Sequence, residues 1–151
     1  MKRKIVLSLL ISLLLITLTS CKSKVISTNK DNYQIYIDEF YQFQIGKKEG
    51  YVAVDLRDTD IYADGHIKGF ISYNYQNSNK EEFVTYMTGM YNKKITIFLL
   101  DSDGSLVTKV ADLLKSQEYK KIYIYTDGYE SLKELAKNDI FIETGLDNCG
   151  C

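Results

Sequence analysis

VAVDLRDTDIYADGHIKGFISYNY, residues 52–75, is the stretch of this sequence that decides the fold. Its opening, within residues 51–57, is rich in apolar β-forming residues and predicts a buried strand that ends at Asp55. Two glycines and three aspartates follow and predict a turn with a short helix. Residues 71–75 predict a second short strand. The stretch therefore predicts a strand–helix–strand unit, with polar side chains gathered where the first strand ends.

Strands and helices alternate through the rest of the chain. The continuous apolar run KITIFLL, residues 94–100, is typical of a parallel strand buried on both faces. Further segments are a strand over 120–126 and helices over 80–91, capped by Asn79, over 106–115 and over 128–137. Near the start, Tyr33, Ile35 and Ile37 alternate and predict a first strand, after which Asp38 is expected to cap a helix over 39–48. This succession predicts an α/β domain with a mostly parallel central sheet flanked by helices.

Residues 1–20 are expected to be a lipoprotein signal peptide rather than part of the fold. Three basic residues at positions 2–4 precede an apolar run over 5–18 that is short for a membrane span. The junction LTSC, residues 18–21, resembles the lipobox of bacterial lipoproteins, which are cut before the cysteine and lipidated on its thiol. An ordinary signal peptide with a chance cysteine is the alternative. We expect a lipid on Cys21, a tether over 21–32, and a protein held in the cell envelope outside the cytoplasmic membrane.

The composition limits the remaining chain to one domain of about 130 residues. The sequence holds 19 basic and 20 acidic side chains, so we expect no basic face and no nucleic-acid partner. Only one histidine, His66, is present, and cysteine is absent from residues 22–148. No metal site and no cofactor are therefore expected.

Residues 52–75 resemble the rhodanese-like domain, in which an apolar strand ends in Asp-x-Arg and a short helix leads to Gly-His-Ile-x-Gly. The matching motif residues are Asp55, Arg57, Gly65, His66 and Gly69. A second block, residues 119–132, is similar to the family's later strand and glycine turn, with Asp127 and Gly128 replacing a glycine pair. The resemblance covers roughly residues 33–137. It implies one domain over 33–140 before a tail over 141–151, and a structural role for His66.

The loop LLDSDGSL, residues 99–106, follows the apolar strand, where parallel α/β sheets carry their chemistry. Its Asp-x-Asp-Gly-Ser-Leu resembles the first motif of haloacid dehalogenase phosphatases, where the first aspartate attacks phosphorus and both aspartates hold magnesium. Thr126 could mimic that family's second motif. However, too little chain follows Thr126 for the lysine and acidic pair that the family also needs. A calcium loop is excluded because helix-core residues fill the required spacing. The same loop is expected to cap the next helix in any case.

The rhodanese resemblance gives this loop a different meaning. Active members of that family carry a cysteine as its first residue, inside a ring of backbone N–H groups that stabilises the thiolate. Aligning the family's loop glycine on Gly104 puts Asp101 in the cysteine's place, with Leu106 and Val107 where an arginine and a serine often follow. We expect the carboxylate to accept several N–H groups and to occupy the anion site itself. The loop with the features of an active site comprises Asp101, Ser102, Asp103, Gly104, Ser105 and Leu106.

These inferences predict a membrane-anchored protein with one rhodanese-like domain and without sulfurtransferase activity, used for binding or as a scaffold. The alternative is an extracytoplasmic protein that handles thiols or persulfides through Cys149 and Cys151, whose CGC tail could form a disulfide, bind a soft metal or carry a persulfide. An incidental or intermolecular disulfide is the simpler explanation of that tail. A phosphatase acting through Asp101 comes third. The expected partner is the membrane, through lipidated Cys21, and no other partner or ligand is indicated.

Overall fold

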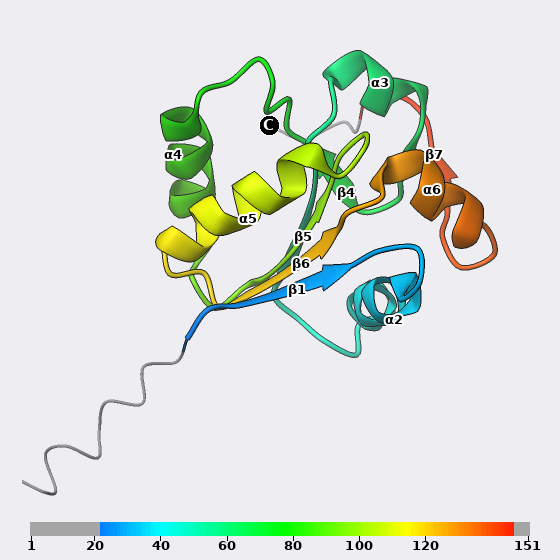
Figure 1. Cartoon of the computed structure of the whole chain (residues 1–151), viewed down its shortest axis with the longest axis horizontal. Coiled ribbons are helices and arrows are strands. Elements are labelled where there is room, and N and C mark those ends of the chain that lie inside the picture. The colour runs from blue at the N-terminus through cyan, green and yellow to red at the C-terminus, as the bar shows by residue number, and fades with distance from the viewer. Residues whose placement is uncertain (1–21, 147–151) are drawn as a thin grey trace, which may run out of the picture.

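A five-stranded parallel sheet forms the centre of the structure, a computed structural model that describes residues 22–146 (Figure 1). Its strands are β1 (Lys24–Thr28), β2 (Tyr51–Asp55), β4 (Phe70–Ser72), β5 (Thr96–Leu100) and β6 (Lys121–Tyr125). They lie in the order β1-β6-β5-β2-β4, and every pair in this sheet is parallel. A second, two-stranded antiparallel sheet joins β3 (His66–Ile67) to β7 (Ile142–Glu143). The α/β class with a parallel central sheet is therefore confirmed.

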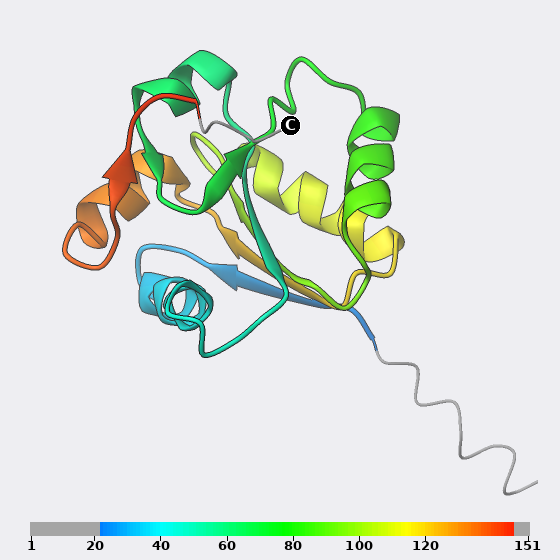
Figure 2. The ribbon, with the colours of Figure 1, turned by 180° about the vertical axis from the view of Figure 1, so that it is seen from behind.

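Helices cover both faces of the sheet, as the two views in Figures 1 and 2 show. They are α2 (Tyr33–Gln44), α3 (Thr59–Asp64), α4 (Lys80–Met90), α5 (Ser105–Ser116) and α6 (Gly128–Leu135). Helices α4 and α5 pack on one face, against Ile97 and Leu99 of β5, while α2 and α6 pack on the other, against Phe98 and Leu100. Alternate residues of β5 thus enter two separate cores. This double burial explains why residues 97–100 of the strand are all apolar.

The tether expected over residues 21–32 is wrong in its central part. Lys24–Thr28 form β1, which pairs with β6 from Lys24 opposite Lys121 to Thr28 opposite Tyr125. Val25 packs against one core and Ile26 against the other, so this short segment bridges both faces of the sheet edge. The folded domain therefore begins at β1 rather than at residue 33, almost immediately after the expected lipidation site.

The strand expected at residues 33–37 is also wrong, because these residues begin helix α2. The side chains that this helix buries are Tyr36, Ile37, Phe40 and Phe43. Their spacing is that of one helix face, which a reading of alternate positions misses. Asp38 is not an N-cap. It lies inside the helix, exposed, and accepts a hydrogen bond from the Gln34 amide.

The other predicted elements are confirmed with small shifts of their ends. The strand ending at Asp55 is β2, and Asn79 caps α4 through a capping box with Glu82. The tail expected from residue 141 contributes β7 to the small sheet. The signal peptide, Cys21, Cys149 and Cys151 lie outside the described residues. Between residues 22 and 146, no helix has the length and apolar character needed to cross a membrane.

Candidate functional site

The loop between β5 and α5 closes around the carboxylate of Asp101. One carboxylate oxygen accepts the N–H of Gly104 at 2.5 Å, and the other accepts those of Leu106 at 2.6 Å and Val107 at 3.3 Å. The side chain is only 2% exposed. These N–H groups include donors from the first turn of α5, which have no acceptor within the helix. Asp101 thus supplies the negative charge that a ring of amides at a helix start attracts.

Two glycines lock this loop against the turn after β6. Gly104 has φ +85°, and a Cβ there would lie 1.7 Å from the carbonyl oxygen of Thr126. Gly128 has φ +78°, and a Cβ there would lie 2.2 Å from the carbonyl oxygen of Ser102. Only glycine fits a left-handed backbone at such close approach. The two loops therefore hold each other in one conformation, and the ring of N–H groups is rigid.

A buried ion pair lies at the end of the neighbouring strand β2. The Asp55 carboxylate and the Arg57 guanidinium are 0% and 2% exposed, and Arg57 Nη2 lies 2.7 Å from Asp55 Oδ2. Arg57 Nε donates to both carboxylate oxygens, and Nη2 also donates to the Gly65 carbonyl at 2.8 Å. Arg57 thereby ties the end of β2 to the turn after α3. The guanidinium is directed into the protein rather than toward a ligand.

Tyr129 connects the ion pair to the Asp101 loop. Its backbone N–H donates to the Asp101 carbonyl at 2.8 Å, and its ring stacks on the Arg57 guanidinium at 3.5 Å. Burial is the main cause that raises the pKa of its hydroxyl, which has no hydrogen-bond partner among the described residues. Tyr129 is not among the site residues predicted from the sequence. Its only sequence signal is its position directly after the Gly128 turn.

His66 is buried at 1% exposure in contact with α3. Its ring stacks on that of Tyr62, with 3.8 Å between centroids, and Nδ1 lies 3.1 Å from the Tyr62 carbonyl oxygen. The backbone of His66 pairs with Glu143 in the small sheet. The contacts are those of a residue that connects α3 to β3. Gly69 has φ +89° close to Gln44, so it serves the turn into β4.

The edge that carries the loop is strongly acidic. Residues 29–32, 56–64, 101–104 and 126–130, which follow the carboxyl ends of the strands and include α3 and the start of α6, hold eight acidic and two basic residues: Asp31, Asp58, Asp60, Asp64, Asp101, Asp103, Asp127, Glu130, Lys30 and Arg57. Burial first, and the carboxylates of Asp55 and Asp101 next, hold the pKa of Tyr36 well above its usual value. Hydrogen bonds from Ser105 lower the pKa of Asp103. Such an edge repels anions that approach from solvent.

The predicted site residues therefore form two adjoining groups, one around the Asp101 carboxylate and one around the ion pair of Asp55 and Arg57. Asp101, Gly104 and Leu106 surround one carboxylate, whereas Ser102 and Ser105 are exposed and point no group at it. Asp103 accepts the Ser105 N–H and lies outside the ring. Between residues 22 and 146, no cluster of three or more His, Cys, Asp or Glu could hold a metal ion. Both oxygens of Asp101 already accept N–H groups, so the geometry does not favour the phosphatase alternative.

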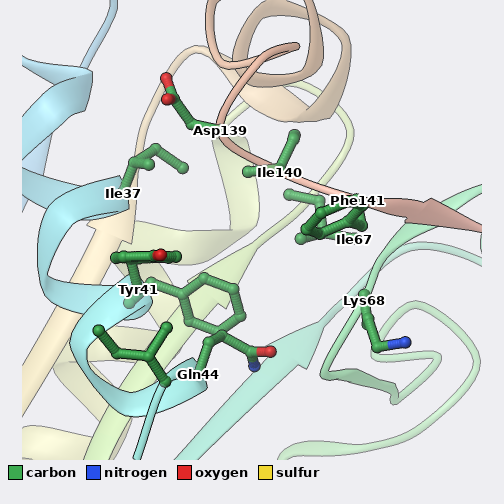
Figure 3. A pocket seen from close by; sticks show the side chains of 10 residues that line it. Ile37, Tyr41, Gln44, Ile67, Lys68, Asp139, Ile140 and Phe141 are labelled. Atoms are coloured by element: carbon green, nitrogen blue, oxygen red, sulfur yellow. The ribbon is translucent and has the colours of Figure 1, made fainter. Parts of the chain in front are cut away.

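An apolar hollow lies elsewhere on the molecule, between α2 and the segment before β7 (Figure 3). It has a volume of about 290 Å³, and its lining includes Ile37, Tyr41, Ile67 and Phe141. Polar side chains at its margin come from Gln44, Lys68 and Asp139, and no residue of the Asp101 loop takes part. This hollow is thus separate from the ring of N–H groups.

Comparison with known proteins identifies the fold around this loop. The family model described as the rhodanese-like domain matches residues 37–135, well over half of the chain. The chain belongs to the rhodanese-like family. Its rhodanese-like domain retains the Asp-x-Arg and Gly-His-Ile-x-Gly residues, and the structure uses them as internal ties around Arg57 and His66.

Solved structures agree with this assignment at the level of the fold. The rhodanese-like domain of the Alr3790 protein from Anabaena sp., solved by NMR, has 16% identity and a TM-score of 0.58, and the match covers 82% of each chain. A crystal structure of Alr3790 has 18% identity and a TM-score of 0.58, with 74% of this chain and 80% of that chain covered. A full-length protein from Lactobacillus plantarum has 21% identity and a TM-score of 0.54 and covers 95% of this chain and 99% of its own. No curated protein matches the chain.

Proposed function

We propose that this rhodanese-like protein is anchored in the cell envelope through Cys21 and has no sulfurtransferase activity in its loop, so that it acts by binding or as a scaffold. The observation that carries the proposal is the Asp101 carboxylate, which accepts the N–H groups of Gly104, Leu106 and Val107. In the alignment on Gly104, Asp101 stands where active family members have their cysteine. The anion site is then filled by a group of the chain itself.

A carboxylate in this position cannot do the chemistry of a thiolate. In sulfur transfer from thiosulfate, a thiolate sulfur attacks the outer sulfur, a new S–S bond forms, and sulfite leaves with the electrons of the broken bond. The persulfide then passes its sulfur to an acceptor such as cyanide, which regenerates the thiolate. The Asp101 oxygens are hydrogen-bonded and offer no sulfur nucleophile. The acidic residues around the loop further disfavour the approach of an anionic sulfur donor.

A second candidate function uses the terminal thiols. The N–H of Gly145 donates to the Ala63 carbonyl at 2.7 Å, so the described chain ends beside α3, at the same edge of the sheet as the Asp101 loop. Cys149 and Cys151 follow Leu146 by three and five residues. An extended chain covers about 3.3–3.6 Å per residue, so thiols at these positions are within reach of that edge. The length of chain after Leu146 thus permits these thiols to act at that edge, which supports thiol or persulfide handling as the alternative.

Thiosulfate:cyanide sulfurtransferase assays on residues 22–151 separate the proposals. The chain as it stands, and the Cys149→Ser/Cys151→Ser double variant, are expected to be inactive. Asp101→Cys in that double variant is expected to gain activity, because the introduced thiolate lies inside the ring of N–H groups. Ser102→Cys is the matched control: it places a thiol in the same loop outside the ring, and no gain is expected.

Each other outcome has a defined meaning. Activity that disappears in the double serine variant would establish the thiol-handling alternative. Activity that persists in the double variant would refute the inactive loop. Equal gains from Asp101→Cys and Ser102→Cys would refute the role assigned to the ring. Anchoring is tested separately by intact mass spectrometry of the full-length protein from the membrane fraction, which is expected to show a lipid on Cys21 that the Cys21→Ser variant lacks.

A further inference from the structure

The lysines of this chain gather at the amino ends of the sheet strands, opposite the Asp101 loop. The connections there are residues 22–24, 45–50, 91–95 and 115–121, and together we call them the basic edge. They hold nine lysines and two glutamates: Lys22, Lys24, Lys47, Lys48, Lys93, Lys94, Lys115, Lys120, Lys121, Glu49 and Glu118. The carboxyl edge described above has the opposite excess. The total charge is nearly balanced, but the two ends of the sheet carry opposite charges. The expectation of no basic face is therefore wrong.

Backbone hydrogen bonds hold these connections side by side. The N–H of Lys24 donates to the Lys120 carbonyl at 2.8 Å, and the N–H of Lys120 donates to the Lys93 carbonyl at 3.1 Å. The N–H of Thr96 donates to the Gly50 carbonyl at 2.9 Å, which joins the connection before β2 to the start of β5. Figures 1 and 2 both show the start of β1 beside the turns that lead into β5 and β6. The lysines therefore share one end of the molecule.

Only part of this positive charge is neutralised within the protein. Glu39 on α2 lies 2.7 Å from both Lys48 and Lys121, and Lys93 lies over the ring of Tyr119. The exposed lysines of the edge with no ion pair among residues 22–146 are Lys22, Lys24, Lys47, Lys94 and Lys115. They leave a surface whose charge complements an anionic partner.

The short distance along the chain between Cys21 and β1 indicates which anionic partner this is. Lys24 begins β1, three residues after Cys21 and six residues after the end of the apolar run over residues 5–18. Three residues span at most about 11 Å, so a membrane that holds Cys21 lies directly against the basic edge. We propose that the basic edge docks on anionic phospholipid headgroups and thereby fixes the domain with its Asp101 loop facing away from the membrane. This inference rests on the proposed anchoring, but not on the inactivity of the loop.

Binding of the domain to vesicles tests the docking surface without the anchor. Residues 22–146 contain the whole sheet and both cores, so the chain from residue 22 onward is a folded unit. It is expected to cosediment with vesicles containing 30% phosphatidylglycerol and not with pure phosphatidylcholine, and salt is expected to weaken the binding. A basic residue near an anionic surface contributes about fivefold to partitioning. The quadruple variant Lys24→Gln/Lys47→Gln/Lys94→Gln/Lys115→Gln is therefore expected to lose at least about tenfold.

A matched variant separates the surface from net charge alone. Lys30→Gln/Lys80→Gln/Lys109→Gln/Lys137→Gln removes four positive charges outside the basic edge and is expected to keep most of the binding. No binding to phosphatidylglycerol vesicles at low salt, or equal losses in both quadruple variants, would overturn the docking surface. If intact mass spectrometry finds no lipid on Cys21 while the vesicle results hold, the proposed anchoring fails and the docking surface stands. Sulfurtransferase activity would refute the inactive loop without affecting either result.

Discussion

Replacing Asp101 with alanine is expected to destabilise the domain markedly, because it removes the acceptor for three backbone N–H groups. Two of these hydrogen bonds are short, at 2.5 and 2.6 Å, and the third is long, at 3.3 Å. Each hydrogen bond to a charged acceptor contributes about 1.5–3 kcal/mol. Counting only the two short bonds at the lower value gives a loss of about 3 kcal/mol in the free energy of unfolding. For a domain of about 130 residues this lowers Tm by about 10 °C.

The measurement is urea and thermal unfolding followed by circular dichroism, since the chain has no tryptophan. Sulfate at 0.1 M should raise the Tm of Asp101→Ala more than that of the unsubstituted protein, because an anion can now enter the ring of N–H groups. Sulfate also stabilises proteins generally, so Ser102→Ala serves as the control for that effect. A loss below about 1 kcal/mol, with the same sulfate response in all three proteins, would show that Asp101 does not occupy an anion site.

Three further predictions concern the Gly104 turn, the Asp55–Arg57 ion pair and Glu39 beside the basic edge. Gly104→Ala should lower the free energy of unfolding by more than about 2 kcal/mol in urea titrations, because its Cβ would overlap a carbonyl oxygen; a neutral effect would contradict the close packing of the two loops. Arg57→Met should cost about 3–5 kcal/mol by the same assay, since it leaves Asp55 buried without its partner, and Arg57→Met/Asp55→Leu should recover part of that loss. Burial acts to raise the pKa of Glu39, but hydrogen bonds from two lysines outweigh it and lower that pKa. The stability that Glu39 contributes is therefore present above its unfolded pKa of about 4.3 and lost as pH falls through the lower folded value, so Glu39→Gln should flatten the decline of Tm with acid below about pH 5; an unchanged acid limb would refute this.

Two kinds of element are predictable from the sequence: those that bury one face, whose apolar residues recur with a regular spacing, and those that are buried on every side. Residues 97–100 are apolar throughout because β5 enters both cores, and Asn79 with Glu82 marks a helix start through short-range hydrogen bonds. Asp101 could be placed at the start of the loop because it directly follows a predicted strand and precedes a glycine and a predicted helix. Each of these signals depends on neighbours in the chain.

The parts that escaped prediction depend on distant partners. Residues 24–28 are only partly buried, and their strand exists because β6 offers an open edge nearly a hundred residues later. The segment starting at Tyr33 has apolar residues at both alternate and helical positions, and the packing of Phe40 and Phe43 on the sheet selects the helix. The contact of Tyr129 with Arg57 and the separation of charge between the two edges likewise arise only from the folded arrangement.

The pairing of β1 with β6 also sets the order in which the molecule can be assembled. β1 leaves the ribosome before the other strands, yet its partner is residues 121–125. Closing so long a loop is slow, and no stabilising strand pairing forms until both strands are present. The first strand must therefore wait, unpaired, until nearly the whole domain has emerged. Native structure at the β1 edge of the sheet is therefore completed last, after residues 121–125 have emerged.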